Sequence, residues 1–316
     1  MACQASCGSL NAVAGEDVVG RVVEIETDGR HIAINRGFLI VSERGTEIGK
    51  VPLDDIAAVI ANAHGLTYSN NALIEISTRG IPIVLCGANH MPSAIVWPVD
   101  THHVQTGRMN DQIGASLPLK KRLWAQLVRA KILAQAATLA AVGAPNEGFF
   151  LLSRKVRSGD PDNVEAEAAR RYWPLLLGSE FRRDKDGSGV NGILNYGYAV
   201  LRAGVARAVM AAGLHPSFGL MHSNRSNPMV LIDDLMEPFR PSVDREVCRL
   251  VRDGASEVNR DTKMALARIM VVDLPTNLGL SPLMICAERL ARSLTKAYAG
   301  EGEKLDLPLP PWPLES

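Results

Sequence analysis

Residues 100–112, with the sequence DTHHVQTGRMNDQ, separate two halves of the chain that have different hydrophobic periodicities. The stretch is polar and has no period of its own, so we expect it to be a linker. Short apolar runs precede it, and long helical patterns follow it. This change of period predicts two domains, and a chain of 316 residues is long enough to form both.

The first half, residues 20–99, has the pattern of a strand-rich domain. Its runs, such as RVVEIET (21–27) and IAAVIAN (56–62), alternate or are β-branched, and turn sequences such as DGR and RGT divide them. Several short strands with one short helix near residues 69–78 are typical of a β-sandwich. Residues 1–19 read as a loose leader, because they lack the basic and apolar segments of a secretion signal.

The second half, residues 113–303, has the pattern of a helical domain. Amphipathic periods and terminal glycines predict its main helices, at residues 119–143, 163–178, 189–213, 242–253 and 281–300. The Pro-rich residues 304–316 predict an extended arm. The predicted fold class is therefore α+β, with a β-sandwich-like domain followed by an all-α domain.

Charge and hydropathy limit the classes of partner. The chain has 34 Lys and Arg against 34 Asp and Glu, so its overall charge cannot attract nucleic acid. A local group of basic residues between Arg154 and Lys185 could do so, or could be a solvated helix face. No apolar run approaches the roughly 18 residues that cross a bilayer, so we expect a cytoplasmic protein without a membrane partner.

The pair Asp234-x-x-Glu237 has two possible interpretations. An acidic N-cap followed by Glu at the third helical position is a capping box, and Pro238 and Pro241 restrict where the helix begins. Two carboxylates at this spacing also share one helix face, where they repel unless a cation lies between them. The pair alone does not decide between a cap and a cation site.

Two further residues favour a metal site. Glu165 shares a helix face with Ala168, Ala169 and Tyr172, and a carboxylate on such an inward face needs a partner. His222 lies just before a polar loop, where it could also be only hydrogen-bonded to that loop. Two carboxylates and one imidazole suit Mg²⁺ or Mn²⁺.

Four blocks of this sequence together resemble the CRISPR-associated spacer-acquisition integrase family, the first-numbered Cas protein. They are DPDNVEAEAARRYW, VNGILNYGYAVLRAGVARAVMAAGLHPSFGLMH, NPMVLIDDLMEPFRP and the strand-rich region before residue 100. The resemblance implies a strand-rich dimerisation domain followed by a helical catalytic domain. It also implies that Glu165, His222 and Glu237 are catalytic ligands of Mg²⁺ or Mn²⁺, with Asp234 in a supporting role. The segment from His222 to Asp234 resembles the type II form, which works beside one large RNA-guided effector nuclease.

The same resemblance implies the activity and the partners. Members of the family cut DNA and join short foreign fragments into the CRISPR repeat array, by attack of a 3′-OH on a phosphodiester. The expected partners are double-stranded and branched DNA, CRISPR repeat DNA, a second copy in a homodimer, and a dimer of a small ferredoxin-like adaptation protein. The effector nuclease is a further expected partner. The alternatives are a non-catalytic DNA-binding scaffold of the adaptation complex and a general metal-dependent nuclease.

Overall fold

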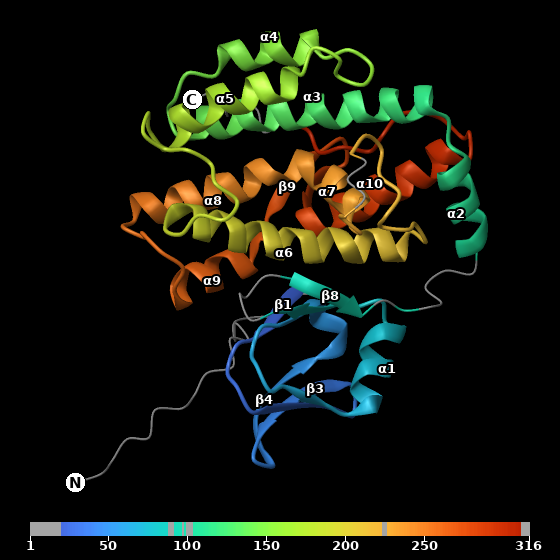
Figure 1. Ribbon diagram of the computed structural model, residues 1–316, viewed down its shortest axis with the longest axis vertical. Coiled ribbons are helices and arrows are strands. Elements are labelled where there is room, and N and C mark those ends of the chain that lie inside the picture. The colour runs from blue at the N-terminus through green and yellow to red at the C-terminus, as the bar shows by residue number, and fades with distance from the viewer. Residues whose placement is uncertain (1–19, 88–91, 97, 99–103, 223–225, 311–316) are drawn as a thin grey trace. The chain divides into compact units, whose positions relative to one another are not determined.

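The computed structural model describes residues 20–87, 92–96, 98, 104–222 and 226–310. The chain divides between residues 100 and 101 into two compact units, which are described separately here. The expected leader, 1–19, and the first residues of the expected linker lie outside the described residues. The order of a strand-rich region followed by a helical region is confirmed (Figure 1).

The N-terminal unit contains two four-stranded sheets and one helix. Its elements are β1 (Arg21–Ile25), β2 (Arg30–Asn35), β3 (Phe38–Glu43), β4 (Thr46–Pro52), β5 (Ile56–Ala61), β6 (Thr67–Tyr68), α1 (Asn70–Thr78), β7 (Ile83–Cys86) and β8 (Pro92–Val96), with a 3₁₀ turn at Leu53–Asp55. The strand orders are β1-β5-β7-β8 and β4-β3-β2-β6. The β2–β3 and β3–β4 hairpins turn at Arg36-Gly37 and Arg44-Gly45, where all four residues have positive φ, as a type I′ turn requires.

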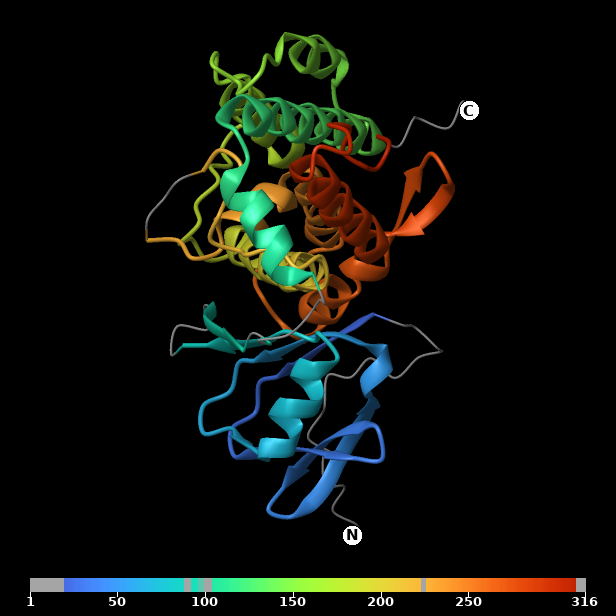
Figure 2. The ribbon, with the colours of Figure 1, turned by 90° about the vertical axis from the view of Figure 1, so that its right-hand side faces the viewer.

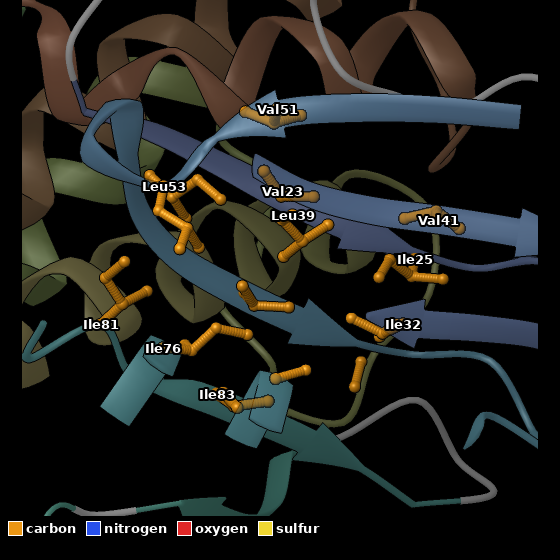
Figure 3. Packing of buried hydrophobic residues seen from close by; sticks show 14 residues of the cluster. Val23, Ile25, Ile32, Leu39, Val41, Val51, Leu53, Ile76, Ile81 and Ile83 are labelled. Atoms are coloured by element: carbon orange, nitrogen blue, oxygen red, sulfur yellow. The ribbon is translucent and has the colours of Figure 1, made fainter. Parts of the chain in front are cut away.

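The β-sandwich prediction is only partly right for this unit. In the first sheet, β1, β5 and β7 are parallel, and only β8 is antiparallel. Every residue of β5 is buried, as is usual for the central strand of a covered parallel sheet. Both sheets and α1 nevertheless contribute side chains to one apolar core, including Ile32, Leu39, Val59 and Ile76. Figure 3 shows this core, with labelled side chains from several strands pointing toward one another.

The C-terminal unit is mainly helical. Its helices are α2 (Gln105–Gly114), α3 (Leu117–Ala141), α4 (Glu147–Lys155), α5 (Val164–Leu177), α6 (Val190–Ala211), α7 (Val230–Met236), α8 (Arg240–Arg252), α9 (Arg260–Ala267) and α10 (Leu283–Tyr298). Turns of 3₁₀ helix lie at Glu237–Phe239 and Ile269–Val271. The long α3 lies beside α4 and α5, while α6 packs on α7, α8 and α10 (Figure 1). At Gly197 and Gly204 of α6, a Cβ atom would lie 2.5 Å from Val243 and 2.1 Å from Met270, so a larger residue at either position would require these side chains to move.

Three predictions for this unit need correction. The all-α description is wrong, because β9 (Asp273–Thr276) and β10 (Gly279–Pro282) form an antiparallel hairpin, visible as orange-red arrows in Figure 2. The expected linker is helical from residue 105, as α2. The described part of the Pro-rich tail packs on the fold: Leu305 is buried, and the Leu309 N–H donates to the Pro275 carbonyl at 2.8 Å. None of the helices in the described part of the chain is long and apolar enough to cross a membrane.

Candidate active site

Glu165 lies on the first turn of α5, and Asp160, which is not among the predicted site residues, fixes this turn. The Asp160 carboxylate accepts hydrogen bonds from the backbone N–H groups of Val164 at 2.9 Å and Glu165 at 3.0 Å. It therefore satisfies N–H groups that have no partner within the helix. The neighbouring acid, Asp162, is instead paired with Arg157. The Glu165 side chain is 20% exposed, and its Oε1 lies beside the ammonium of Lys131.

His222 is held by Asp234. Asp234 Oδ1 lies 2.5 Å from His222 Nδ1, and Oδ2 accepts from the backbone N–H groups of Leu220 at 2.7 Å and Met221 at 3.4 Å. Residues 219–222, with the sequence GLMH, can approach this carboxylate closely because Gly219 has no side chain. A Cβ at this position would lie only 2.8 Å from Asp234 Oδ2. The contact with Asp234 orients the imidazole and leaves its other ring nitrogen, Nε2, for another partner.

The two members of this pair both have raised pKa values. The hydrogen bond with Asp234 raises the pKa of His222 above its ordinary value, against partial burial, and the charges of Glu165 and Glu237 add to the rise. Burial raises the pKa of Asp234 and outweighs the opposing effects of His222 and the backbone N–H groups. The edge of the Trp124 ring also packs on the imidazole, with centroids 5.1 Å apart.

The capping-box interpretation of Asp234 and Glu237 is wrong. Asp234 lies inside α7 and is fully buried, and Glu237 begins a 3₁₀ turn rather than the third position of a helix. The N-cap of α8 is Phe239. Contacts with residues 220–222 account for Asp234, and contacts with Lys131 and Arg240 account for Glu237, instead of helix capping.

Glu237 is buried among cations. Arg240 Nε donates to its Oε1 at 2.9 Å, and Lys131 Nζ lies 2.5 Å from its Oε2. This second contact is an ion pair without hydrogen-bond geometry. Glu237 Oε2 therefore has the Lys131 ammonium as a charge partner but accepts no hydrogen bond from the described residues. Burial disfavours the charge of Glu237, but Arg240 and Lys131 outweigh it and hold its pKa at about 2. The carboxylate is therefore ionised at neutral pH.

Lys131 connects the two acidic candidates. Its ammonium donates to Glu165 Oε1 at 2.6 Å while it also lies against Glu237, and the lysine side chain is only 13% exposed. Because both carboxylates also influence the pKa of His222, the structure brings all three predicted residues into one neighbourhood. They come from α5, the segment before α7, and the 3₁₀ turn after it.

Lys131 is not among the residues that the sequence predicts for the site. It occupies an inward face of α3, one turn from buried Leu127 and one turn from buried Gln135. The available signal was a lysine on an apolar helix face, where a charge needs a partner. This is the same signal that identified Glu165.

The chemistry of these residues fits a divalent cation, although their arrangement is not that of a metal site. Within the residues that the structure describes, no three His, Cys, Asp or Glu side chains are gathered in a way that could hold a metal ion. The Lys131 ammonium lies against both carboxylates instead. The donor set still consists of two carboxylates, one with an oxygen that accepts no hydrogen bond, and an oriented imidazole. Mg²⁺ and Mn²⁺ accept such ligands.

A cavity of about 320 Å³ adjoins Glu237, and its walls include Arg183 and Lys185 from the basic group predicted between Arg154 and Lys185. Its lining includes Lys131, Gln135, Arg183, Lys185, Arg240 and Asp244. Tyr198 lies under two guanidinium groups, with Arg240 4.8 Å and Arg183 5.3 Å from the ring centroid. The cavity therefore combines cations, an aromatic ring and a buried acid beside the cluster.

Comparison with known proteins identifies a family. The family model described as CRISPR associated protein Cas1 matches residues 23–267. A protein of Neisseria meningitidis serogroup C named CRISPR-associated endonuclease Cas1 is 37% identical over 229 residues, which are 72% of this chain and 75% of that protein.

Two solved structures have the same fold at low sequence identity. A casposase bound to integration product matches with a TM-score of 0.78 and 18% identity, over 94% of this chain and 95% of that one. A Cas6-RT-Cas1–Cas2 complex matches with a TM-score of 0.70 and 17% identity, over 98% of this chain and 38% of that one.

Proposed function

This chain belongs to the CRISPR-associated Cas1 family, and we propose that it is a metal-dependent DNA endonuclease and integrase of CRISPR adaptation. Its reaction joins short foreign DNA fragments into the CRISPR repeat array. The observation that carries the proposal is the convergence of Glu165, His222 and Glu237 from separate segments: the two carboxylates share the Lys131 ammonium, and the charges of both raise the pKa of His222. The identity with the meningococcal protein supports a type II form.

The proposed metal ligands are Glu165, His222 and Glu237, and the proposed ion is Mg²⁺ or Mn²⁺. Such an ion, when bound, stabilises negative charge on a phosphoryl oxygen and on the attacking or leaving oxygen. Asp234 has a supporting role, because its contact with Nδ1 of His222 fixes the orientation of the imidazole. Arg240 keeps Glu237 ionised and in place.

The proposed chemistry is a transesterification. The 3′-oxygen of the incoming fragment forms a bond to a phosphorus atom at the edge of a repeat, and its proton leaves to solvent. The bond from that phosphorus to the 3′-oxygen of the repeat strand breaks, and the released oxygen takes up a proton. Water in place of the 3′-OH gives hydrolysis, which is the endonuclease reaction. No covalent protein intermediate is needed.

DNA contacts would come from local basic groups, because the chain has no net charge. Within the segment from Arg154 to Lys185, some cations are already paired, such as Arg157 with Asp162 and Arg171 with Glu167. Arg183 and Lys185 line the cavity beside Glu237, so we assign phosphate contacts to them first.

We also propose the partners. Joining both ends of a fragment needs two active sites, which a homodimer supplies, with the strand-rich unit as dimerisation domain. We further propose assembly with a dimer of a small ferredoxin-like adaptation protein, and the solved Cas6-RT-Cas1–Cas2 complex supports a Cas partner in general. The proposed nucleic-acid ligands are double-stranded and branched DNA, including CRISPR repeat DNA, and the casposase bound to integration product supports DNA as a ligand in general. The RNA-guided effector nuclease is a further proposed partner.

One observation favours the alternative of a non-catalytic DNA-binding scaffold. Lys131 already neutralises the two carboxylates that a metal would need. A scaffold would bind branched DNA equally well in a chelator and would never cut or join it. A general nuclease, in contrast, would need metal but would show no preference for repeat ends.

The test is strand transfer of a labelled short duplex into a repeat-bearing plasmid, with Mn²⁺ or with a chelator and with the adaptation partner always present. We expect joining only with metal, and a loss of about 100-fold or more in His222→Ala, because one ligand is gone. His215→Ala is the matched control: it lies in the same segment, where its ring packs on Phe218 and accepts from the Ser217 N–H. We expect it to keep wild-type joining. DNA binding without joining in any metal would favour the scaffold, and normal joining by His222→Ala would refute the ligand assignment.

A further inference from the structure

Lys131 has a position that neither an ordinary surface ion pair nor a simple core residue explains. Its ammonium lies 2.6 Å from Glu165 Oε1 and 2.5 Å from Glu237 Oε2, and the three side chains are 13%, 20% and 8% exposed. We propose that Lys131 takes the place of the metal ion in the metal-free protein and leaves the carboxylates when the metal binds. This inference rests on the proposed metal site.

The electrostatics of the cluster require a cation in this place. Two carboxylates that are withdrawn from water repel each other, and each pays a desolvation cost unless a positive charge lies beside it. Arg240 serves only Glu237 Oε1, so Lys131 is the cation that the two carboxylates share in the described part of the chain. The metal-free fold therefore depends on its ammonium.

The same ammonium and a metal ion exclude each other. A divalent ion must take carboxylate oxygens at roughly 2.1 Å, whereas Lys131 occupies one oxygen of each carboxylate. Two positive charges that share these oxygens would repel each other strongly in a site with little water. Binding of the ion therefore requires the lysine side chain to turn away.

The structure offers a place for the displaced ammonium. Lys131 already lines the cavity of about 320 Å³, together with Gln135 and Asp244. Gln135 is on the same helix one turn further along, is 3% exposed, and its Oε1 accepts no hydrogen bond from the described residues. An acceptor without a donor beside a movable lysine is the second, independent observation for this inference. Because Lys131 and Gln135 line the same cavity, we assign the displaced ammonium to the Gln135 side of it.

The inference predicts opposite effects of two neighbouring substitutions on metal affinity. Lys131→Met removes the competing cation, so metal-stripped protein should bind Mn²⁺ about tenfold more tightly or better, as removal of a competing state requires. Gln135→Met removes the acceptor for the displaced ammonium, so it should weaken Mn²⁺ binding. Lys120→Met is the matched control, because Lys120 lies on the same helix and forms no ion pair with any described residue. It should leave the affinity unchanged.

The measurement is calorimetric titration of Mn²⁺ into the full-length chain, with circular dichroism first to establish that each variant is folded. Thermal unfolding supplies a second readout that needs no DNA. In a chelator, Lys131→Met should melt below wild type because the carboxylates lose their cation, and Mn²⁺ should raise its melting temperature more than that of wild type. If Lys131→Met does not fold, Lys131→Gln and the Gln135→Met titration still test the inference.

The outcomes separate the two proposals. Mn²⁺ binding by wild type, with equal or weaker binding by Lys131→Met, overturns the role of Lys131 and leaves the metal site standing. An absence of Mn²⁺ binding in wild type and in every variant overturns the metal site and this inference with it. Tighter Mn²⁺ binding by Lys131→Met and weaker Mn²⁺ binding by Gln135→Met support both the metal site and the role of Lys131.

Discussion

Glu237 and Asp244 are buried carboxylates of one short segment, yet their surroundings have opposite effects on acidity. Glu237, on the 3₁₀ turn, is surrounded by Arg240 and Lys131, which hold its pKa at about 2. Asp244, on α8, is 2% exposed, and burial raises its pKa to about 6 although Tyr198 and Tyr172 donate to it at 2.5 and 3.1 Å. Arg240 and Lys131 also lower the pKa of Asp244, but their described ion pairs are with Glu165 and Glu237, so the two tyrosine hydroxyls and these charges do not outweigh the burial of Asp244.

This contrast separates two functions within one wall of the cavity. An ionised carboxylate near another acid attracts a cation, so the Glu237 side suits metal or lysine. The Asp244 side is a hydrogen-bonded junction between α5, α6 and α8, because its partners Tyr172 and Tyr198 come from the other two helices. We expect substitutions on the first side to act through charge and those on the second through packing and protonation.

The largest effect on stability should follow from removal of a cation at Glu237. Arg240→Met takes away the Nε donor of Glu237 Oε1 and leaves Lys131 as the remaining cation at Glu237 among the described residues. Loss of one partner of a buried ion pair destabilises by 3–5 kcal/mol, and the remaining lysine places this variant near about 3 kcal/mol. Urea unfolding in a chelator measures the change.

The control for this variant lies on the same helix. Arg249 pairs with Glu246 and Asp253, but its side chain is 54% exposed. Because solvent screens such pairs, Arg249→Met should cost less than about 1 kcal/mol. Equal losses in the two variants would contradict the distinction between a buried charge cluster and a surface pair.

A smaller effect should appear in the pH dependence of Asp244→Asn. Asp244 binds its proton more tightly in the folded chain, at a pKa of about 6 against an ordinary value of 3.8. The stability from this group is therefore present below pH 3.8 and is lost as the pH rises through about 6. Asn cannot titrate, so the variant does not lose this stability. The free energy of unfolding of the variant minus that of wild type should therefore increase by about 2 kcal/mol as the pH rises from 4 to 7.5. Urea unfolding at both pH values gives this difference, and a difference independent of pH would mean that Asp244 remains ionised throughout.

The sequence predicts the acidic and imidazole side chains better than their surroundings. Glu165 was found because its helix face is otherwise apolar, and His222 and Glu237 lie in blocks that resemble the family. A lysine on an apolar helix face indicates that Lys131 needs a partner, but the partners of Lys131 and of Asp244 lie in distant segments, and no local spacing identifies them. The capping-box interpretation failed for the same reason, since Asp234 receives its partners from residues 220–222 rather than from its own helix.

Secondary structure was missed where tertiary contacts replace a local pattern. α2 is polar and has no apolar period, but Gln112 is fully buried and bonds the His215 and Phe218 carbonyls and the His215 N–H. These contacts stabilise a helix in a segment that resembles a linker. The β9–β10 hairpin is only four residues to a strand and includes Pro275 and Pro282, which argue against strands in any local reading.

The smallest effect should come from the hydroxyl of Tyr198. Tyr198→Phe removes the donor to Asp244 Oδ1 but keeps the ring that lies under Arg240 and Arg183. Tyr172 still donates to Asp244 Oδ2, so the loss should be about 1 kcal/mol in urea unfolding at pH 7.5. In the Asp244→Asn background the same substitution should cost less, because the acceptor is then neutral, and this double-mutant cycle isolates the interaction. An equal cost in both backgrounds would mean that the Tyr198 hydroxyl acts through packing rather than through the Asp244 carboxylate.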